Sequence, residues 1–122
     1  MTDAPHIKRG TEGEALATAF LVEKGFRILD RNWRFQRLEI DIVAIDGEEL
    51  VIVEVKTRKK NDLQLPRDLI PLKKQKYLIE AADAYIRQNV VNRETRFDVI
   101  IIHTDGTRYS LEHIPRAFYP TI

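Results

Sequence analysis

The chain has no cysteine among its 122 residues, and its apolar runs stop at about four residues. The first absence excludes a disulfide framework, a thiolate zinc site and a cysteine nucleophile. The second excludes a membrane-spanning helix, which needs about 20 apolar residues. The opening stretch "MTDAPHIKRG" also lacks the apolar core of a signal peptide. We therefore expect a soluble cytoplasmic protein that does not contact a membrane.

Repeats, linkers and low-complexity tracts are absent as well, and the sequence has no glycine-rich phosphate loop and no serine-nucleophile elbow. His6, His103 and His113 have no mutual spacing that suggests a metal site or a triad, so we interpret them as structural or exposed. The hydrophobic fraction of 43% and the charged fraction of 32% are ordinary for a globular protein. The length predicts a single domain over residues 1–122.

Seven segments have the periodicity of a helix or a strand. Helices are predicted at 11–25 and 71–91, and strands at 26–35, 38–45, 50–56, 96–103 and 107–114. Pro115 to Phe118 is expected to form a short terminal turn. The buried face of the second helix is expected to contain Leu72, Ile79, Ala82, Ile86 and Val90. The order αβββαββ predicts an α/β fold with a mixed five-stranded sheet flanked by helices.

Charged residues interrupt the second and third strands, which are otherwise rich in Val, Ile and Leu. Alternate residues of a strand share a face, so Glu39 and Asp41 lie on one face of the second strand. A four-residue turn at 46–49 would place Asp41 opposite Glu54 and Glu39 opposite Lys56. A two-residue turn shifts this pairing by two but keeps the same faces together. The other face is expected to be apolar, with Leu38, Ile40, Ile42, Ala44, Val51, Val53 and Val55.

Opposed carboxylates repel each other unless a proton or a cation lies between them. The paired oxygens of Asp41 and Glu54 suit Mg²⁺ or Mn²⁺, which keep several waters and accept phosphate oxygens. Lys56, on the same face, can contact a metal-bound water or the phosphate. The metal ion and the lysine together can orient water and stabilise the negative charge that develops on the phosphate. The pattern predicts metal-assisted phosphodiester hydrolysis, and the alternative is a charge ladder on a solvated sheet face.

The positive charge of the chain is concentrated in one segment. The formal net charge is only +1, but residues 56–76 contain eight basic and two acidic side chains, which gives this segment +6 and the remainder −5. A basic segment beside acidic residues suits a polyanion held near a metal, and a solvated loop and helix end would explain the charge equally well. The candidate nucleic-acid-binding residues are Arg58, Lys59, Lys60, Lys73, Lys74 and Lys76.

Several motifs resemble those of a known nuclease superfamily. The D…E-V-K pattern of Asp41, Glu54 and Lys56 on adjacent strands resembles the PD-(D/E)xK superfamily, which has the restriction-endonuclease-like fold. More narrowly, the chain is similar to the YraN-like family of uncharacterised proteins, itself similar to archaeal Holliday-junction resolvases. That family usually has Gly where this chain has Leu38. The stretches that carry the similarity are GTEGEALATAFLVEKGFRILDRNWR, EIDIVA, VEVKTR, RFDVIII and IPRAF.

The resemblance assigns a role to each matching residue. It implies that Asp41 and Glu54 are metal ligands, that Lys56 is the catalytic lysine and that Glu14 is an auxiliary acid from the first helix. Glu39 belongs to the E-I-D motif of the family. The sequence around Glu14 also fits a capping box, with Thr11 as the N-cap and Glu14 at the third helical position.

The activity implied by the resemblance is that of an endonuclease dependent on Mg²⁺ or Mn²⁺, with DNA, branched or damaged, as the substrate. A homodimer is possible, because cleavage of two strands is simplest with two sites. Two alternatives stay open. One is a nucleic-acid-binding module that keeps the fold without catalysis, and the other is a structural domain whose charged strands form a protein interface.

Overall fold

The computed structural model describes residues 5–59 and 70–120, which form two helices and five strands. In chain order these are α1 (Pro5–Glu23), β1 (Arg27–Phe35), β2 (Leu38–Asp46), β3 (Glu49–Lys59), α2 (Leu72–Asn89), β4 (Thr95–Thr104) and β5 (Tyr109–Phe118). The predicted order αβββαββ is confirmed. Among the described residues, neither helix is long and apolar enough to cross a membrane.

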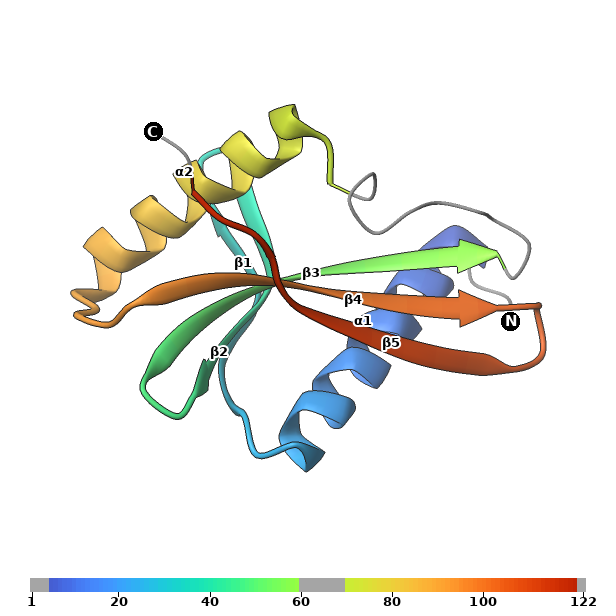
Figure 1. Ribbon diagram of the computed structural model, residues 1–122. Helices are drawn as coiled ribbons and strands as arrows, with labels where there is room; N and C mark the ends of the chain where they lie inside the picture. Colours follow the sequence, from blue (N-terminus) through green and yellow to red (C-terminus); the bar gives the residue numbers. More distant parts are fainter. Residues whose placement is uncertain (1–4, 60–69, 121–122) are drawn as a thin grey trace.

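The five strands form one mixed sheet in the order β1-β2-β3-β4-β5. Only β3 and β4 run parallel, because α2 lies in the connection between them, and the other neighbours are antiparallel. Figure 1 shows α1 and α2 on opposite sides of this sheet. The α/β fold with a five-stranded sheet flanked by helices is therefore the one that the sequence predicted.

Each helix buries apolar side chains against its own face of the sheet. On one face, Ala17 and Leu21 of α1 pack with side chains of β2, β3 and β4. On the other face, Leu78, Ala81, Ala82 and Tyr85 of α2 pack with a second set from the same strands and from β5. Residues 99–102 of β4 are buried and alternate between the two clusters.

The start of α1 differs from the prediction. The helix begins at Pro5, a residue well suited to a first turn, and Thr11 lies inside it. The interpretation of Thr11 and Glu14 as a capping box is therefore wrong. At the other end Gly25 stops the helix as expected, because its φ of +99° is a conformation that glycine adopts at little cost.

The buried face of α2 also differs in part. Leu72 and Val90 were expected on it, but they are 58% and 86% exposed. Tyr85 is buried instead, with its hydroxyl donating to Asp30 Oδ2 at 2.7 Å. Val90 ends the helix in the left-handed conformation, with φ +52° and ψ +53°, at a cost of about 1–2 kcal/mol for a β-branched residue.

The expected terminal turn at Pro115 to Phe118 is wrong, because β5 continues to Phe118. A register shift between Phe97 and Val99 of β4 bends the pair, and Arg116 on β5 has a φ of +53°. The backbone N–H of Arg116 there donates to Asp98 Oδ1 at 3.0 Å. The hydrogen bond fixes the bulge that keeps β5 in the sheet.

Asp98 is the centre of a buried polar network at this bulge. It is 1% exposed and is bound by Arg96 and by His113 Nε2, which lies 2.8 Å from Oδ2. Burial alone raises the pKa of Asp98, but the hydrogen bonds from His113, Arg96 and Arg116 outweigh it and hold that pKa below its usual range. His113 is thus structural, as expected.

Candidate functional site

The site begins where β2 parts from β3. The predicted register of these strands is confirmed from Ile45–Leu50 onward, but the ladder ends at Ile42–Val53. One residue beyond it, Asp41 Oδ2 accepts a hydrogen bond from the backbone N–H of Val55 at 2.8 Å. The Asp41 carboxylate therefore takes the place of a backbone acceptor between the two strands.

The side-chain alternation of β2 changes at the same point. Leu38 and Ile40 were expected on the face of Ile42 and Ala44, but they pack in the cluster under α2. That expectation is wrong because β2 no longer follows the β3 ladder beyond Asp41. Because β2 separates from β3 here, the Asp41 carboxylate lies between the two strands and not on one face of the sheet.

The surroundings of Asp41 favour its neutral form. Burial is the largest influence on its pKa, followed by the charge of Glu54, and both raise it. The hydrogen bond from Val55 lowers the pKa, whereas the charges of Glu14 and Glu39 raise it slightly further. The result is a pKa of about 7. The charge of Glu54 is thus near enough to raise the pKa of Asp41, which agrees with the expected convergence of the two side chains.

Glu54 is buried and lies between two lysines. It is 8% exposed, and its Oε2 lies 3.5 Å from Lys56 Nζ and 3.7 Å from Lys74 Nζ. Lys56 reaches it from the same strand, and Lys74 reaches it from the first turn of α2. Lys74 also lies over the ring of Tyr77, 4.4 Å from its centroid. A buried carboxylate needs such partners, so α2 supplies part of the site.

The contact between Lys74 and Glu54 was missed by the sequence analysis, which placed Lys74 only on a nucleic-acid surface. One signal was available. A lysine in the first turn of a helix is disfavoured by the helix dipole, so its presence there indicates a negative partner. The identity of that partner depends on how α2 crosses β3, which sequence spacing does not specify.

Glu39 does not lie opposite Lys56, so that expectation is wrong. It pairs with Arg34 on β1 at 3.6 Å, and its side chain is 41% exposed. The reason is again that this part of β2 follows β1 instead of β3. The backbone N–H of Glu39 donates to the Tyr77 hydroxyl at 2.8 Å, and that hydroxyl donates to the Arg37 carbonyl at 3.1 Å.

Glu14 approaches from the other side of the sheet. It is half-buried on α1, and its charge contributes to the raised pKa of Asp41. The preceding residue, Gly13, allows a close approach of α1 to β3, because a Cβ there would lie 3.2 Å from Thr57 Oγ1. Glu14 and Glu54 therefore act on Asp41 from opposite faces, across the gap between β2 and β3.

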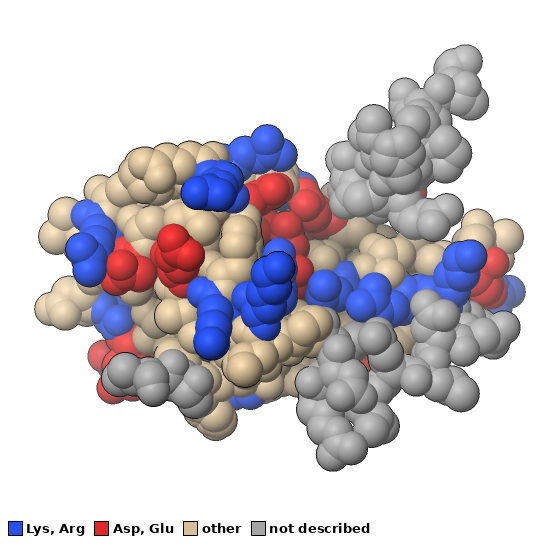
Figure 2. Space-filling model, turned by 90° about the horizontal axis from the view of Figure 1, so that it is seen from above, with Lys and Arg blue, Asp and Glu red and all other residues tan. Residues whose placement is uncertain are grey.

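The other basic candidates surround this group less closely. Lys73 and Lys76 are exposed on α2, and Arg58 and Lys59 lie at the end of β3. Lys60 lies outside the described residues. Figure 2 shows acidic side chains in the middle of this face, with basic side chains beside them and in a row extending from them. The described basic residues of 56–76 are thus divided between the site and its surroundings.

A divalent ion at this site would have few protein ligands. Within 5–59 and 70–120, no three Asp, Glu or His side chains come together as a ready cage for a metal. Mg²⁺ does not require one, since it usually keeps waters and binds one or two carboxylates together with substrate phosphates. A cation between Asp41 and Glu54 would also relieve the repulsion that raises the pKa of Asp41. The two carboxylates fit a hydrated ion with few protein ligands.

The fold and the site define an α/β protein with a carboxylate–lysine group at the point where two strands of its sheet separate. The model of the Uncharacterised protein family UPF0102 matches residues 13–102, a range that contains Glu14, Asp41, Glu54 and Lys56. The chain belongs to this family, and the similarity to YraN-like proteins is thereby confirmed.

Relatives in the same family match over nearly their whole length. The chain is 43% identical to a UPF0102 protein of Phocaeicola vulgatus over 119 residues, which cover 98% of each chain. It is 40% identical to a UPF0102 protein of Parabacteroides distasonis, over 90% of this chain and 91% of the relative. It is 41% identical to UPF0102 protein FP2501 of Flavobacterium psychrophilum, over 95% and 98%.

Proposed function

We propose that the protein is a metal-dependent endonuclease that hydrolyses phosphodiester bonds in DNA. The observation that carries the proposal is that Asp41 accepts a hydrogen bond from the N–H of Val55, the residue after Glu54, while the buried Glu54 carboxylate lies near Lys56 and Lys74. Neighbouring carboxylates with adjacent lysines suit phosphate chemistry. The carboxylates can hold a cation, and the lysines offer positive charge to the phosphate of the substrate. The resemblance to the PD-(D/E)xK superfamily supports the same reaction.

Each residue of the group has a distinct role in this proposal. Asp41 and Glu54 would hold Mg²⁺ or Mn²⁺, which supplies a Lewis acid and lowers the pKa of a water when bound. Lys56 stabilises the negative charge that develops on the phosphate. Lys74 positions the Glu54 carboxylate through the shared oxygen Oε2. Glu14 adds negative charge from α1 and favours cation binding near Asp41.

DNA would approach over the basic residues near the site. Lys73 and Lys76 on α2 are exposed, and Arg58 and Lys59 continue from Lys56 along β3. Cations along such a surface neutralise backbone phosphates without reading the base sequence. Lys60, outside the described residues, is proposed to bind the same phosphates. A second copy of the chain would provide the second site for cleavage of both strands, and a cytoplasmic location would give access to DNA.

A second function is favoured by one feature of the site. Lys56 and Lys74 already compensate the charge of Glu54 without a metal. This arrangement suits a nucleic-acid-binding module that keeps the fold but does not cleave. The two functions share the basic surface and differ in whether Asp41 and Glu54 are needed.

A cleavage assay separates the two functions. The wild-type protein is incubated with Mn²⁺ or with EDTA and with single-stranded, duplex, flap and four-way DNA. We expect Mn²⁺-dependent cleavage of at least one substrate and a loss of about 100-fold or more in Glu54→Gln and Lys56→Ala. Arg87→Gln, which removes an exposed charge from the far end of α2, is the control. Binding without cleavage would support the binding module, and the absence of both would exclude both functions.

A further inference from the structure

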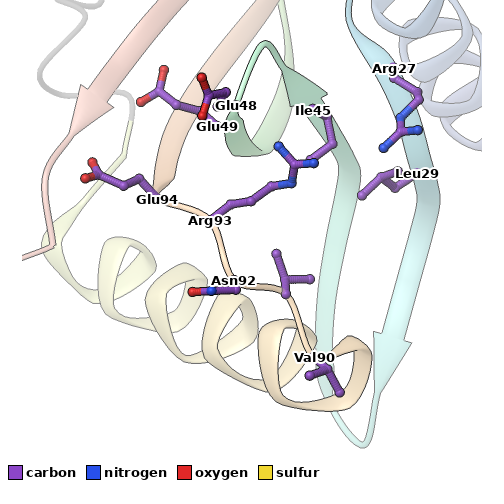
Figure 3. Close-up of a pocket in the computed structure, with 10 residues that line it drawn as sticks. Arg27, Leu29, Ile45, Glu48, Glu49, Val90, Asn92, Arg93 and Glu94 are labelled. Atoms are coloured by element: carbon purple, nitrogen blue, oxygen red, sulfur yellow. The ribbon is translucent and has the colours of Figure 1, made fainter.

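A pocket with a volume of about 800 Å³ lies at the C-terminal end of α2. It is open to solvent and is formed by the α2–β4 connection, the start of β1 and the β2–β3 turn (Figure 3). Ile45, which lines it, is four residues from Asp41 along β2, a separation of about 13 Å. The pocket is therefore separate from the candidate site.

Two arginines from different elements point into this pocket. Figure 3 shows the side chain of Arg93 extending across it toward β2, with the guanidinium of Arg27 facing it from β1. Within the described parts of the chain, neither guanidinium has an ion pair or a hydrogen bond. Two like charges directed at one space leave a position at which an anion would interact with both.

The acidic residues of the pocket do not occupy this position. Glu48, Glu49 and Glu94 also line it, but Figure 3 shows their carboxylates on the far side, away from Arg27. Glu49 is already bound by Arg96 and Arg116, each at 2.9 Å. The positive side of the pocket is thus separate from its negative side.

Apolar side chains lie beside the two arginines. Val90 and Leu29 both line the pocket and are 86% and 36% exposed. Val90 also has the left-handed backbone conformation, for which glycine or asparagine is usual at the end of a helix. A strained and exposed valine that contributes little to the core is evidence for a contact outside the fold. The pocket therefore offers apolar surface next to positive charge.

We propose that this pocket binds a phosphate monoester that carries a planar or apolar group. The phosphate lies between Arg27 and Arg93, which suit the two charges of a monoester dianion. The attached group covers Val90 and Leu29. A free nucleoside monophosphate and the 5′-phosphate end of a nucleic-acid strand both present this chemistry. The binding site does not depend on whether Asp41 and Glu54 act in catalysis.

The test is a titration followed by amide chemical shifts in ¹H–¹⁵N spectra of the full chain. The probes are AMP, adenosine, inorganic phosphate and a trinucleotide with or without a 5′-phosphate. We expect AMP at millimolar concentration to shift amides of residues 90–94 and to bind more tightly than adenosine or phosphate. Arg27→Gln and Arg93→Gln should each weaken AMP about tenfold, whereas Arg87→Gln on the same helix should not. Comparison of AMP with the two trinucleotides identifies the source of the phosphate.

A second variant tests the apolar part of the pocket. Val90→Gly should raise the Tm by a few degrees, because it relieves the left-handed valine, and should weaken AMP more than inorganic phosphate. Shifts spread over the whole surface, or equal binding by wild type and an Arg27→Gln/Arg93→Gln double variant, would overturn the proposal.

Discussion

The fold strongly alters the ionisation of Asp41. Its pKa is raised from 3.8 to about 7, first by burial and then by the charge of Glu54. Between these two values the native state holds a proton that the unfolded chain releases. The contribution of Asp41 to stability is therefore present below about pH 4 and is lost as the pH rises through 7.

Asp41→Asn should remove the loss of native-state stability that wild type shows as the pH rises through 7. The amide keeps an oxygen that can accept the hydrogen bond from Val55, so the fold should be retained. Without divalent ions, the free energy of unfolding of the variant should exceed that of wild type by about 1–2 kcal/mol at pH 8, less than the full shift implies because Asp41 is partly solvated. The difference should shrink toward pH 5. Denaturant titrations at several pH values measure it, and a difference independent of pH would contradict the account.

Lys74 has a contact in the structure that the sequence did not predict. Its Nζ lies 3.7 Å from Glu54 Oε2, on the oxygen that Lys56 also approaches. Lys74→Gln should lower kcat of the proposed cleavage about tenfold or more with a smaller change in KM, because Glu54 is then held by one cation only. The stability cost should be about 1 kcal/mol or less, since Lys56 remains. Equal kcat values for Lys74→Gln and Arg87→Gln would limit Lys74 to a structural role.

At the scale of elements, the second turn of α2 is tied to the β1–β2 turn and to the start of β2 by one hydroxyl group. Tyr77 accepts from the Glu39 N–H and donates to the Arg37 carbonyl, at 2.8 and 3.1 Å. This connection fixes α2 next to the strand that carries Asp41. It also places Lys74, three residues earlier, above Glu54.

Tyr77→Phe should therefore affect both stability and the site. It leaves two backbone groups without their partner, which costs about 1–2 kcal/mol. Tyr85→Phe is the matched control. Its hydroxyl also ties α2 to the sheet, through Asp30 of β1 at 2.7 Å, but Tyr85 lies about 16 Å further along the helix than Lys74. Thermal unfolding should show similar losses for both, and only Tyr77→Phe should also reduce metal-dependent cleavage. A site effect of equal size in Tyr85→Phe would contradict the role of Tyr77.

Elements were predictable from local patterns to different degrees. The register of β2 and β3 followed from side-chain alternation up to Ile42, because both faces there are buried. The change at Asp41 was not predictable, since it depends on a side chain that replaces a backbone acceptor of β3. The continuation of β5 past Pro115 likewise depends on the hydrogen bond between Arg116 and Asp98. Such long-range contacts leave no periodic signal in the sequence.

At the scale of the whole molecule, charge is distributed unevenly. A net charge of only +1 conceals a segment of +6 at residues 56–76, and the structure divides the basic side chains that it describes there between Glu54 and the surface. Lys73 and Lys76 are on the surface side of α2. The candidate residues on β2 and β3 were identifiable from the sequence because they lie on two consecutive strands joined by a short turn. The position of α2 was not predictable, because it depends on contacts between segments distant in the sequence.

The surface lysines should contribute to nucleic-acid binding without regard to sequence. In Lys73→Gln/Lys76→Gln, the slope of log affinity against log salt concentration should shrink by about 0.9 for each lost contact with a duplex phosphate. Affinities measured at several salt concentrations on two unrelated duplexes should fall equally. An unchanged slope would remove this end of α2 from the binding surface.

Asp41 and Glu54 are proposed to share a divalent cation, and a melting series with Mn²⁺ tests this most directly. Wild type and Asp41→Asn are compared with and without 10 mM Mn²⁺ at pH 8 and pH 5.5. Preferential binding to the native state should raise the Tm of wild type by a few degrees at pH 8. The rise should be smaller at pH 5.5, where a proton on Asp41 competes with the metal. Asp41→Asn should show no rise at either pH, and a rise equal to that of wild type would contradict the claim.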